Sequence, residues 1–317
     1  MSEIKSQIKA ELTRLLTEKS IDVAIAFKNA DAPLRPQPAF FRNPDDLTDL
    51  EYNGLCQNNL ANYLTRFPSD TRIGMVVRGC ESRSVNALIV ERQHPRENLF
   101  LIGIPCQGIV DLKKIVKLTG EDITQYSENQ DKVSILFKGQ TLTFSRNDLL
   151  HDSCLRCVHP NPVNADITLG DLVPEGDPAI AFESVQSFQS LDKDERYAWF
   201  QQEAERCIRC YACREACPMC YCTECFVDHA TPRWTETEAS PAGTHGWHLI
   251  RAFHLAGRCT SCGACERACP MDIKMTYLTD KLNEDIFEAY AFETGMDDQT
   301  QPPFASFNMD DKNRFVI

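Results

Sequence analysis

Apolar residues recur at helical spacing at the start of the chain. They stand three or four positions apart at Ile4, Ile8, Leu12 and Leu15, with charged residues between them. This pattern predicts an amphipathic helix over residues 1–16. A secretory signal would need an unbroken apolar core behind a basic start, so the pattern also predicts a cytoplasmic protein.

Short apolar runs alternate with amphipathic stretches between residues 71 and 119. Residues 73–79 and 98–105 are apolar runs that predict buried strands, and residues 84–92 and 109–118 have helical spacing. Strands that alternate with helices favour a largely parallel sheet with helices on its faces. We therefore expect an α/β domain with a mixed, largely parallel sheet in the N-terminal half.

The pattern changes after residue 130. Residues 131–144 alternate apolar and polar positions, which predicts a hairpin that turns at Lys138, Gly139 and Gln140. Further along, three segments have helical spacing: residues 192–207 with Asp192 as N-cap, residues 247–256 before Gly257, and residues 273–292.

A change of composition divides the chain into two parts. Pro and Gly cluster at residues 174–178, so we place a domain boundary there, between residues 1–178 and 179–317. A length of 317 residues is also typical of about two domains. The last stretch, residues 299–317, is proline-rich and then polar, which fits a docked tail and a disordered tail equally well.

Charge and composition exclude several classes of protein. The formal net charge of −13 argues against binding nucleic acid or inserting into an anionic membrane surface, because those partners favour clustered Lys and Arg. No apolar run approaches the roughly 20 residues of a membrane span. The chain has no phosphate-binding loop, no nucleophile elbow and no zinc-protease motif, so we assign no catalytic residues.

Sixteen cysteines need an explanation in a cytoplasmic protein. Disulfides are rare in reducing compartments, and cysteines two residues apart there bind metals or form redox pairs. A zinc protein is the simplest alternative, and zinc sites usually combine two C-x2-C units across a longer gap. The spacing of the cysteines therefore has to decide between zinc and iron–sulfur clusters.

The pattern C-x2-C-x2-C-x3-C-P occurs twice, in residues 207–218 and 259–270. Two-residue gaps let one tight loop place three thiolates around three irons of a cubane. The fourth cysteine is expected to start a helix with proline in its first turn, and in two-cluster ferredoxins it binds the other cluster. The spacing thus predicts two [4Fe–4S] sites: Cys207, Cys210, Cys213 and Cys269 in one, and Cys217, Cys259, Cys262 and Cys265 in the other.

The two motifs resemble those of bacterial-type dicluster ferredoxin modules over residues of about 200 to 280. The resemblance implies an α+β dicluster ferredoxin-like domain in the C-terminal half, followed by a helix and the tail. The chain departs from that pattern in one respect, because 41 residues, 218–258, separate the two copies.

Four more cysteines follow the predicted strands of the N-terminal half. Cys80 and Cys106 each come after a strand, and a C-x2-C pair follows at Cys154 and Cys157. Loops at the carboxyl ends of parallel strands are where such sheets build their sites. Taken alone, Cys80 and Cys106 are also explained as buried core residues.

Segments around these cysteines resemble the beta-subunit family of coenzyme F420-reducing hydrogenases and formate dehydrogenases. Residues 103–106 read G-I-P-C after a strand, and residues 165–170 read A-D-I-T-L-G after the C-x2-C pair, as in that family. The resemblance covers roughly residues 20 to 175. It implies a further [4Fe–4S] cluster held by Cys80, Cys106, Cys154 and Cys157.

Members of that family that bind a flavin or a deazaflavin usually have a small, glycine-rich stretch ahead of these elements. Residues 53–64 occupy the equivalent place, and Asn58, Asn59 and Leu60 stand where small residues are expected. The chain also contains no G-x-G-x-x-G motif. The sequence therefore does not favour FAD binding or deazaflavin reduction.

Four cysteines remain after these twelve are assigned: Cys56, Cys220, Cys222 and Cys225. The last three form a C-x-C-x2-C cluster, and free thiols so close together would oxidise. One interpretation is a fourth [4Fe–4S] cluster with Cys56 as the fourth ligand, which requires the two domains to pack together. A zinc site and a solvent-facing redox pair are the alternatives.

These observations predict an electron-transfer subunit rather than a catalytic subunit. Its clusters would pass single electrons between other subunits of an anaerobic oxidoreductase complex. The resemblance implies that the partner is a formate dehydrogenase, a hydrogenase or a heterodisulfide-reductase-like complex. The alternatives are a flavin-containing subunit that itself oxidises or reduces a deazaflavin or nicotinamide coenzyme, and a zinc-stabilised interaction module.

Overall fold

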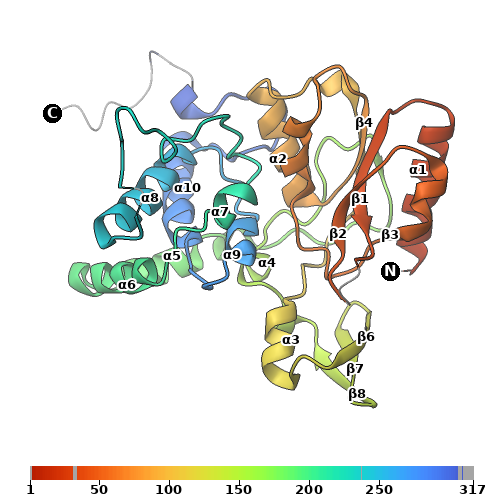
Figure 1. Ribbon diagram of the computed structural model, residues 1–317, viewed down its shortest axis with the longest axis horizontal. Coiled ribbons are helices and arrows are strands. Elements are labelled where there is room, and N and C mark those ends of the chain that lie inside the picture. Colours follow the sequence, from red (N-terminus) through yellow and green to blue (C-terminus); the bar gives the residue numbers. More distant parts are fainter. Residues whose placement is uncertain (1, 31–33, 237, 306–308, 310–317) are drawn as a thin grey trace.

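The computed structural model describes residues 2–30, 34–236, 238–305 and 309. At its centre is a six-stranded sheet with the main order β2-β1-β4-β5-β9, and β3 pairs with β1 (Figure 1). The strands are β1 Val23–Lys28, β2 Gln37–Phe41, β3 Leu50–Glu51, β4 Ile73–Val77, β5 Leu99–Gly103 and β9 Ile167–Thr168. β1, β4, β5 and β9 are parallel, and β2 and β3 are antiparallel to β1. The prediction of a mixed, largely parallel sheet is confirmed.

One face of this sheet is covered by α1, Ser2–Thr17 (Figure 1). The helix buries Ile8, Leu12 and Leu15 against the sheet, which is the stripe that the sequence pattern predicted. The burial of one stripe keeps the charged residues of α1 in solvent, as expected of an amphipathic helix on a core.

The other face of the sheet is covered by α2, Gly79–Val90, and by the 3-10 helix η2, Leu60–Arg66. α2 begins before the predicted start at residue 84. The reason is a cap, because the Glu81 carboxylate accepts a hydrogen bond of 2.9 Å from the backbone amide of Arg78. A carboxylate at this position also interacts favourably with the positive end of the helix dipole.

A second, antiparallel sheet stands apart from the first (Figure 1). Its order is β6-β7-β8, with β6 Ile123–Glu128, β7 Lys132–Phe137 and β8 Gln140–Ser145, and α3, Leu112–Thr119, packs against it. β7 and β8 form the predicted hairpin, which turns at Lys138 and Gly139 with φ of 48° and 79°. Two successive left-handed residues give the tight turn that suits the twist of a hairpin.

The C-terminal half is helical in its described residues. Its helices are α5 Glu183–Gln189, α6 Lys193–Glu205, α7 Ala212–Glu215, α8 Pro241–His254, α9 Ala264–Ala268 and α10 Thr276–Tyr290. α6, α8 and α10 are the three predicted helices, and Asp192 caps α6 through the amides of Asp194 and Glu195. No strand occurs in residues 169–236 and 238–305, so the β component expected of this half is wrong there. The segments that flank the motifs bury one helical stripe instead, as Trp247 and Ala252 do on α8.

The remaining elements are short. They are α4 Asp152–Leu155 and the 3-10 helices η1 Pro44–Asp49, η3 Arg96–Asn98, η4 Asn147–Leu149, η5 Pro178–Ile180 and η6 Pro303–Ala305. Of the predicted tail, residues 306–308 and 310–317 lie outside the described residues. Within the described part of the chain, no helix has the length and apolar character needed to cross a membrane.

The two halves of the chain share an interface beside α2. Ser84 on α2 places its hydroxyl 3.1 Å from that of Thr260, and Asn86 donates a hydrogen bond of 2.9 Å to the carbonyl oxygen of Gly295. Leu255 of the C-terminal half is part of the same hydrophobic core as the sheet and α2. The N-terminal core thus continues into the C-terminal half, which places the cysteines of both halves close to one another.

Candidate iron–sulfur sites

The two motif loops have the same backbone conformation. Matching positions are left-handed in both: Arg209 and Ser261 have φ of 55° and 52°, and Tyr211 and Gly263 have φ of 58° and 71°. In each loop an amide donates to the sulfur of the first cysteine, from Arg209 to Cys207 and from Ser261 to Cys259, both at 3.4 Å. The sequence repeat is therefore also a structural repeat, and it turns backbone amides toward sulfur.

Three cysteines of the first loop lie around one cysteine of the second. This group, called the outer site, consists of Cys207, Cys210, Cys213 and Cys269, which line a cavity of about 20 Å³. Burial raises the pKa of Cys207 and of Cys213, and the Cys269 thiol contributes to both. Cys210 is exposed, so the outer site reaches the protein surface.

The remaining motif cysteines form a second group, called the inner site. Its members are Cys217, Cys259, Cys262 and Cys265. Burial raises the pKa of Cys259 to about 12 and also raises that of Cys265, and the Cys217 thiol contributes to both. The structure thus brings together the two sets of cysteines that the spacing predicted, including the exchange of the fourth cysteine between loops.

Single-turn helices explain this exchange. α7 leads from Cys213 of the outer site to Cys217 of the inner site, and α9 leads from Cys265 of the inner site to Cys269 of the outer site. These helices come before the fourth cysteines, and turns follow those cysteines at Pro218 and Pro270. The prediction that the fourth cysteine starts a helix is therefore wrong, because the helical turn is already complete before it.

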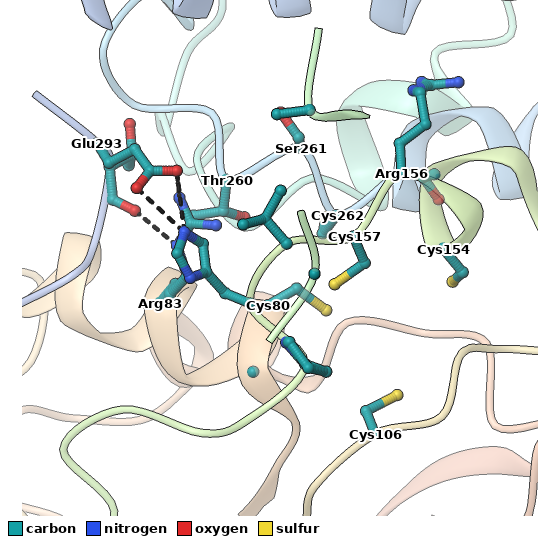
Figure 2. A pocket seen from close by; sticks show the side chains of 18 of the residues that line it. Cys80, Arg83, Cys106, Cys154, Arg156, Cys157, Thr260, Ser261, Cys262 and Glu293 are labelled. Atoms are coloured by element: carbon teal, nitrogen blue, oxygen red, sulfur yellow. Dashed lines mark hydrogen bonds and ion pairs between the residues drawn. The ribbon is translucent and has the colours of Figure 1, made fainter. Parts of the chain in front are cut away.

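A third group, called the N-terminal site, faces one cavity of about 270 Å³ (Figure 2). Its members are Cys80 in the first turn of α2, Cys106 after β5, Cys154 on α4 and Cys157 after α4. Backbone amides again approach sulfur, from Gly108 to Cys106 and from Ile109 to Cys154, both at 3.3 Å. The parallel sheet positions this site, since two of its strands end beside the cavity.

The N-terminal site adjoins the inner site. Cys259 and Cys262 line the same cavity as the four N-terminal cysteines. Burial raises the pKa of Cys80 well above its usual value, and the Cys262 thiol adds to the effect, although Arg78 opposes it. Because α7 and α9 link the inner and outer sites, the three sites follow one another in the order N-terminal, inner, outer.

The Asp280 carboxylate contacts one loop of the inner site and one loop of the N-terminal site. Asp280 on α10 accepts hydrogen bonds from Ser261 Oγ at 2.8 Å and from Arg156 Nη2 at 3.3 Å. Ser261 precedes Cys262 of the inner site, and Arg156 precedes Cys157 of the N-terminal site. Asp280 therefore fixes one loop of each site with respect to the other.

The three donor sets suit [4Fe–4S] clusters. Each offers four cysteine sulfurs, the ligands that such clusters use, and amides that donate to sulfur are among the contacts that tune them. The raised pKa of the buried thiols means that they are protonated without metal, and metal binding would displace those protons. Among the described residues, no three His, Cys, Asp or Glu side chains converge as the ligands of a single ion do.

The cysteine trio, Cys220, Cys222 and Cys225, and Cys56 do not line one common cavity. The trio lines a cavity of about 530 Å³, to which Cys56 does not contribute. Cys56 is fully buried, and burial raises its pKa to about 12. Its backbone carbonyl accepts a hydrogen bond of 2.6 Å from Arg78, which holds it in the N-terminal half. Cys56 and Cys220 nevertheless belong to the same hydrophobic core, so the set of Cys56 with the trio stays a prediction.

Arg78 and Glu81 also hold residues 53–64 in place. Arg78 Nη2 donates to the carbonyl of Asn58 at 2.9 Å, and the Glu81 carboxylate accepts from the amide of Leu60 at 2.9 Å. The buried Asn59 side chain donates to Ser84 Oγ at 3.0 Å. Asn58 and Asn59 thus make specific contacts with α2 and the residue that caps it.

Two comparisons with protein families cover most of the cysteines. Residues 70–193 match the family described as the C-terminal part of the coenzyme F420 hydrogenase/dehydrogenase beta subunit. Residues 203–273 match the 4Fe-4S dicluster domain. The chain is therefore similar to the F420 beta-subunit family over one segment and to the dicluster domain over a second segment. The resemblance that the sequence motifs suggested is confirmed, and the two matches together include the N-terminal, inner and outer sites.

Relatives of known description match almost the whole chain. The F420-dependent formate dehydrogenase subunit beta of Methanocaldococcus jannaschii is 22% identical over 96% of this chain and 95% of its own. The F420-dependent formate dehydrogenase 1 subunit beta of Methanococcus maripaludis is 23% identical over 95% of this chain and 93% of its own. A chain of the F420-reducing [NiFe] hydrogenase complex from Methanosarcina barkeri has 16% identity and a TM-score of 0.42, covering 50% of this chain and 63% of that one.

Sequence reasoning missed the buried arginines near these sites, which are Arg78, Arg146, Arg209 and Arg251. Arg78 is 3% exposed and Arg251 is 5% exposed. Each stands among apolar neighbours in the sequence, Arg78 after the run of β4 and Arg251 on the stripe of α8 that contains Trp247. A charged residue at a core position of a predicted element was the signal that could have identified them.

Proposed function

We propose that the protein is an iron–sulfur subunit that relays single electrons through three [4Fe–4S] clusters. The N-terminal, inner and outer sites would each bind one cluster through their four cysteines. The observation that carries the proposal is the row of three four-cysteine groups, in which neighbouring sites share a cavity or are joined by single-turn helices. Clusters held so close together supply one-electron transfer in short steps.

The position of the sites suggests where electrons enter and leave. The outer site reaches the surface at Cys210, and the neighbouring Ile208 is an exposed apolar residue. The four cysteines of the N-terminal site are partly buried and none of them is exposed, and Cys80 and Cys106 follow the carboxyl ends of sheet strands. We assign the outer site as the end that exchanges electrons with another subunit, because a partner can approach it directly.

The identity of the partner is proposed from the relatives. Both curated relatives are described as beta subunits of an F420-dependent formate dehydrogenase. A formate dehydrogenase complex is therefore the first choice of partner, and hydrogenase and heterodisulfide-reductase-like complexes are related choices. In such a complex this chain would serve as the electron-transfer subunit, in the cytoplasm, with a coenzyme such as F420 at one end of the route.

The proposal is tested by counting iron. Full-length protein reconstituted without oxygen should bind about twelve irons with equal acid-labile sulfide, since each of three clusters has four. Cys154→Ser should lose about four irons, because it removes one ligand of the N-terminal site. Cys56→Ala is the matched control, another buried cysteine of the same domain, and it should keep about twelve.

Other results would support other functions. Loss of about four irons in Cys56→Ala would restore Cys56 as a cluster ligand. Zinc in place of iron would favour the interaction module, and a yellow flavin released by acid would favour the flavin-containing subunit. An unchanged count in Cys154→Ser would contradict the N-terminal site.

A further inference from the structure

Arg251 is a buried cation between the inner and outer sites. It lies on α8, in the insertion that separates the two motif copies, and it is 5% exposed. Within the part of the chain that the structure describes, no carboxylate forms an ion pair with it. A buried charge without a counter-charge is costly, so something else must compensate it.

The hydrogen bonds of Arg251 do not satisfy its charge. Nη2 donates to the carbonyl oxygen of Cys213 at 3.2 Å, and Nη1 approaches the Met275 sulfur at 3.8 Å. Nε is buried and has no hydrogen-bond partner. These contacts fix the guanidinium beside the outer site but provide no negative charge.

Thiols of both sites surround this guanidinium. Burial alone would lower the pKa of Arg251, but Cys265, Cys217, Cys220 and Cys213 outweigh burial and hold the pKa above its usual range. Cys213 belongs to the outer site, whereas Cys217 and Cys265 belong to the inner site. Because these thiols are protonated without metal, the compensating negative charge would come from the cysteine thiolates of clusters bound in the two sites.

Other basic groups near Arg251 do not replace it. His248 lines the cavity of the outer site but is not among the residues that line the cavity shared by the N-terminal and inner sites. Arg209 belongs to the loop of the outer site and donates to the Tyr211 hydroxyl at 2.7 Å. Arg251 is thus the basic residue that both sites share.

We propose that Arg251 is a positioning residue whose charge raises the reduction potentials of the inner and outer clusters together. The inference rests on the proposed function, because it requires clusters in both sites. Reduction adds one negative charge to a cluster, and a fixed cation in a buried environment stabilises that reduced form. The shared cation would make the inner and outer sites better electron acceptors than they are without it.

A potentiometric titration followed by electron paramagnetic resonance tests this inference on the full-length, reconstituted protein. Arg251→Gln removes the charge, Arg251→Lys keeps it without the forked hydrogen bonds, and Arg233→Gln is a control at an exposed arginine with the same change of net charge. We expect Arg251→Gln to weaken reduction of the inner and outer clusters at least about tenfold, which is 59 mV for one electron. The N-terminal cluster, the lysine variant and the control should stay close to wild type.

The outcomes separate the inference from the function on which it rests. Unchanged potentials in Arg251→Gln with about twelve irons present would overturn the inference and leave the relay intact. A purely structural role predicts equal effects of Arg251→Gln and Arg251→Lys on the potentials, and that result would also overturn the inference.

If Arg251→Gln loses iron, Arg251→Met serves as the second neutral variant. Iron loss in both neutral variants but not in Arg251→Lys would support the need for a positive charge at this position. Iron loss in all three variants would overturn the inference. Failure of wild type to bind iron would instead refute the proposed function.

Discussion

At the scale of single residues, the N-terminal site depends on a buried ion pair. Arg78 Nε and Glu81 Oε2 are 2.8 Å apart, with side chains only 4% and 2% exposed. Together they hold residues 53–64 against α2 and stand next to Cys80 and Cys106. Removing one member of such a pair leaves a buried charge without compensation.

Glu81→Gln should therefore destabilise the protein strongly. We expect the free energy of unfolding to fall by about 3–5 kcal/mol, the usual cost of breaking a buried pair. The control is Asp22→Asn, which breaks the ion pair between Asp22 and Arg72. This pair lies on the surface, since the two side chains are 43% and 46% exposed. That change should cost no more than about 1 kcal/mol. Denaturant unfolding followed by circular dichroism measures both, and equal losses would contradict the role given to Glu81.

At the scale of elements, the motif loops combine left-handed residues with close packing between the halves. Gly263 has φ of 71°, and a β-carbon added there would lie 2.2 Å from Ser153 Oγ. Ser153 stands beside Cys154 of the N-terminal site, and Gly263 follows Cys262 of the inner site. This glycine therefore lets a loop of one site approach the other.

Gly263→Ala should disturb both sites, and Gly139→Ala is the matched control. Gly139 also has a left-handed backbone, with φ of 79°, but a β-carbon there would meet nothing within 4 Å. Both changes should cost about 1–2 kcal/mol of backbone strain. Only Gly263→Ala should also lower the iron content, because it pushes the two loops apart. Equal iron in the two variants would show that the close approach is not needed for cluster binding.

At the scale of the whole molecule, the interface between the halves surrounds the adjoining sites. Arg258 and Tyr221 of the C-terminal half both contact the Glu91 carboxylate, which lies just after α2. Lys274 pairs with Asp152, the first residue of α4. If the cysteines on both sides bind clusters, metal binding free energy contributes to this arrangement as folding free energy.

Removing the metal should therefore loosen this interface. After iron is removed with a chelator, we expect faster amide hydrogen exchange in α2, α8 and α9, which carry or contact the sites. The β7–β8 hairpin serves as the internal control, since its core lies with α3, and its exchange should change little. If iron removal changed the exchange rate equally in all these elements, the hairpin included, the clusters would not be what holds the halves together.

The sequence by itself determined the local features. Helical stripes such as Ile8, Leu12 and Leu15 on α1 depend on spacing along the chain, and they appear where they were expected. The grouping of Cys217 with the second motif and of Cys269 with the first was also predicted, because in two-cluster ferredoxins the fourth cysteine of each motif binds the other cluster. The N-terminal group needed more than spacing, and family resemblance supplied it.

Only the tertiary structure decided which distant groups meet. It buries Cys56 in the core that the sheet shares with Cys220, while the trio lines a cavity to which Cys56 does not contribute. It also places Arg251, from the insertion between the motifs, against cysteines of two sites. Local spacing fixes an element and a loop, but burial and charge compensation depend on side chains far apart in sequence, so they are set only when the elements pack together.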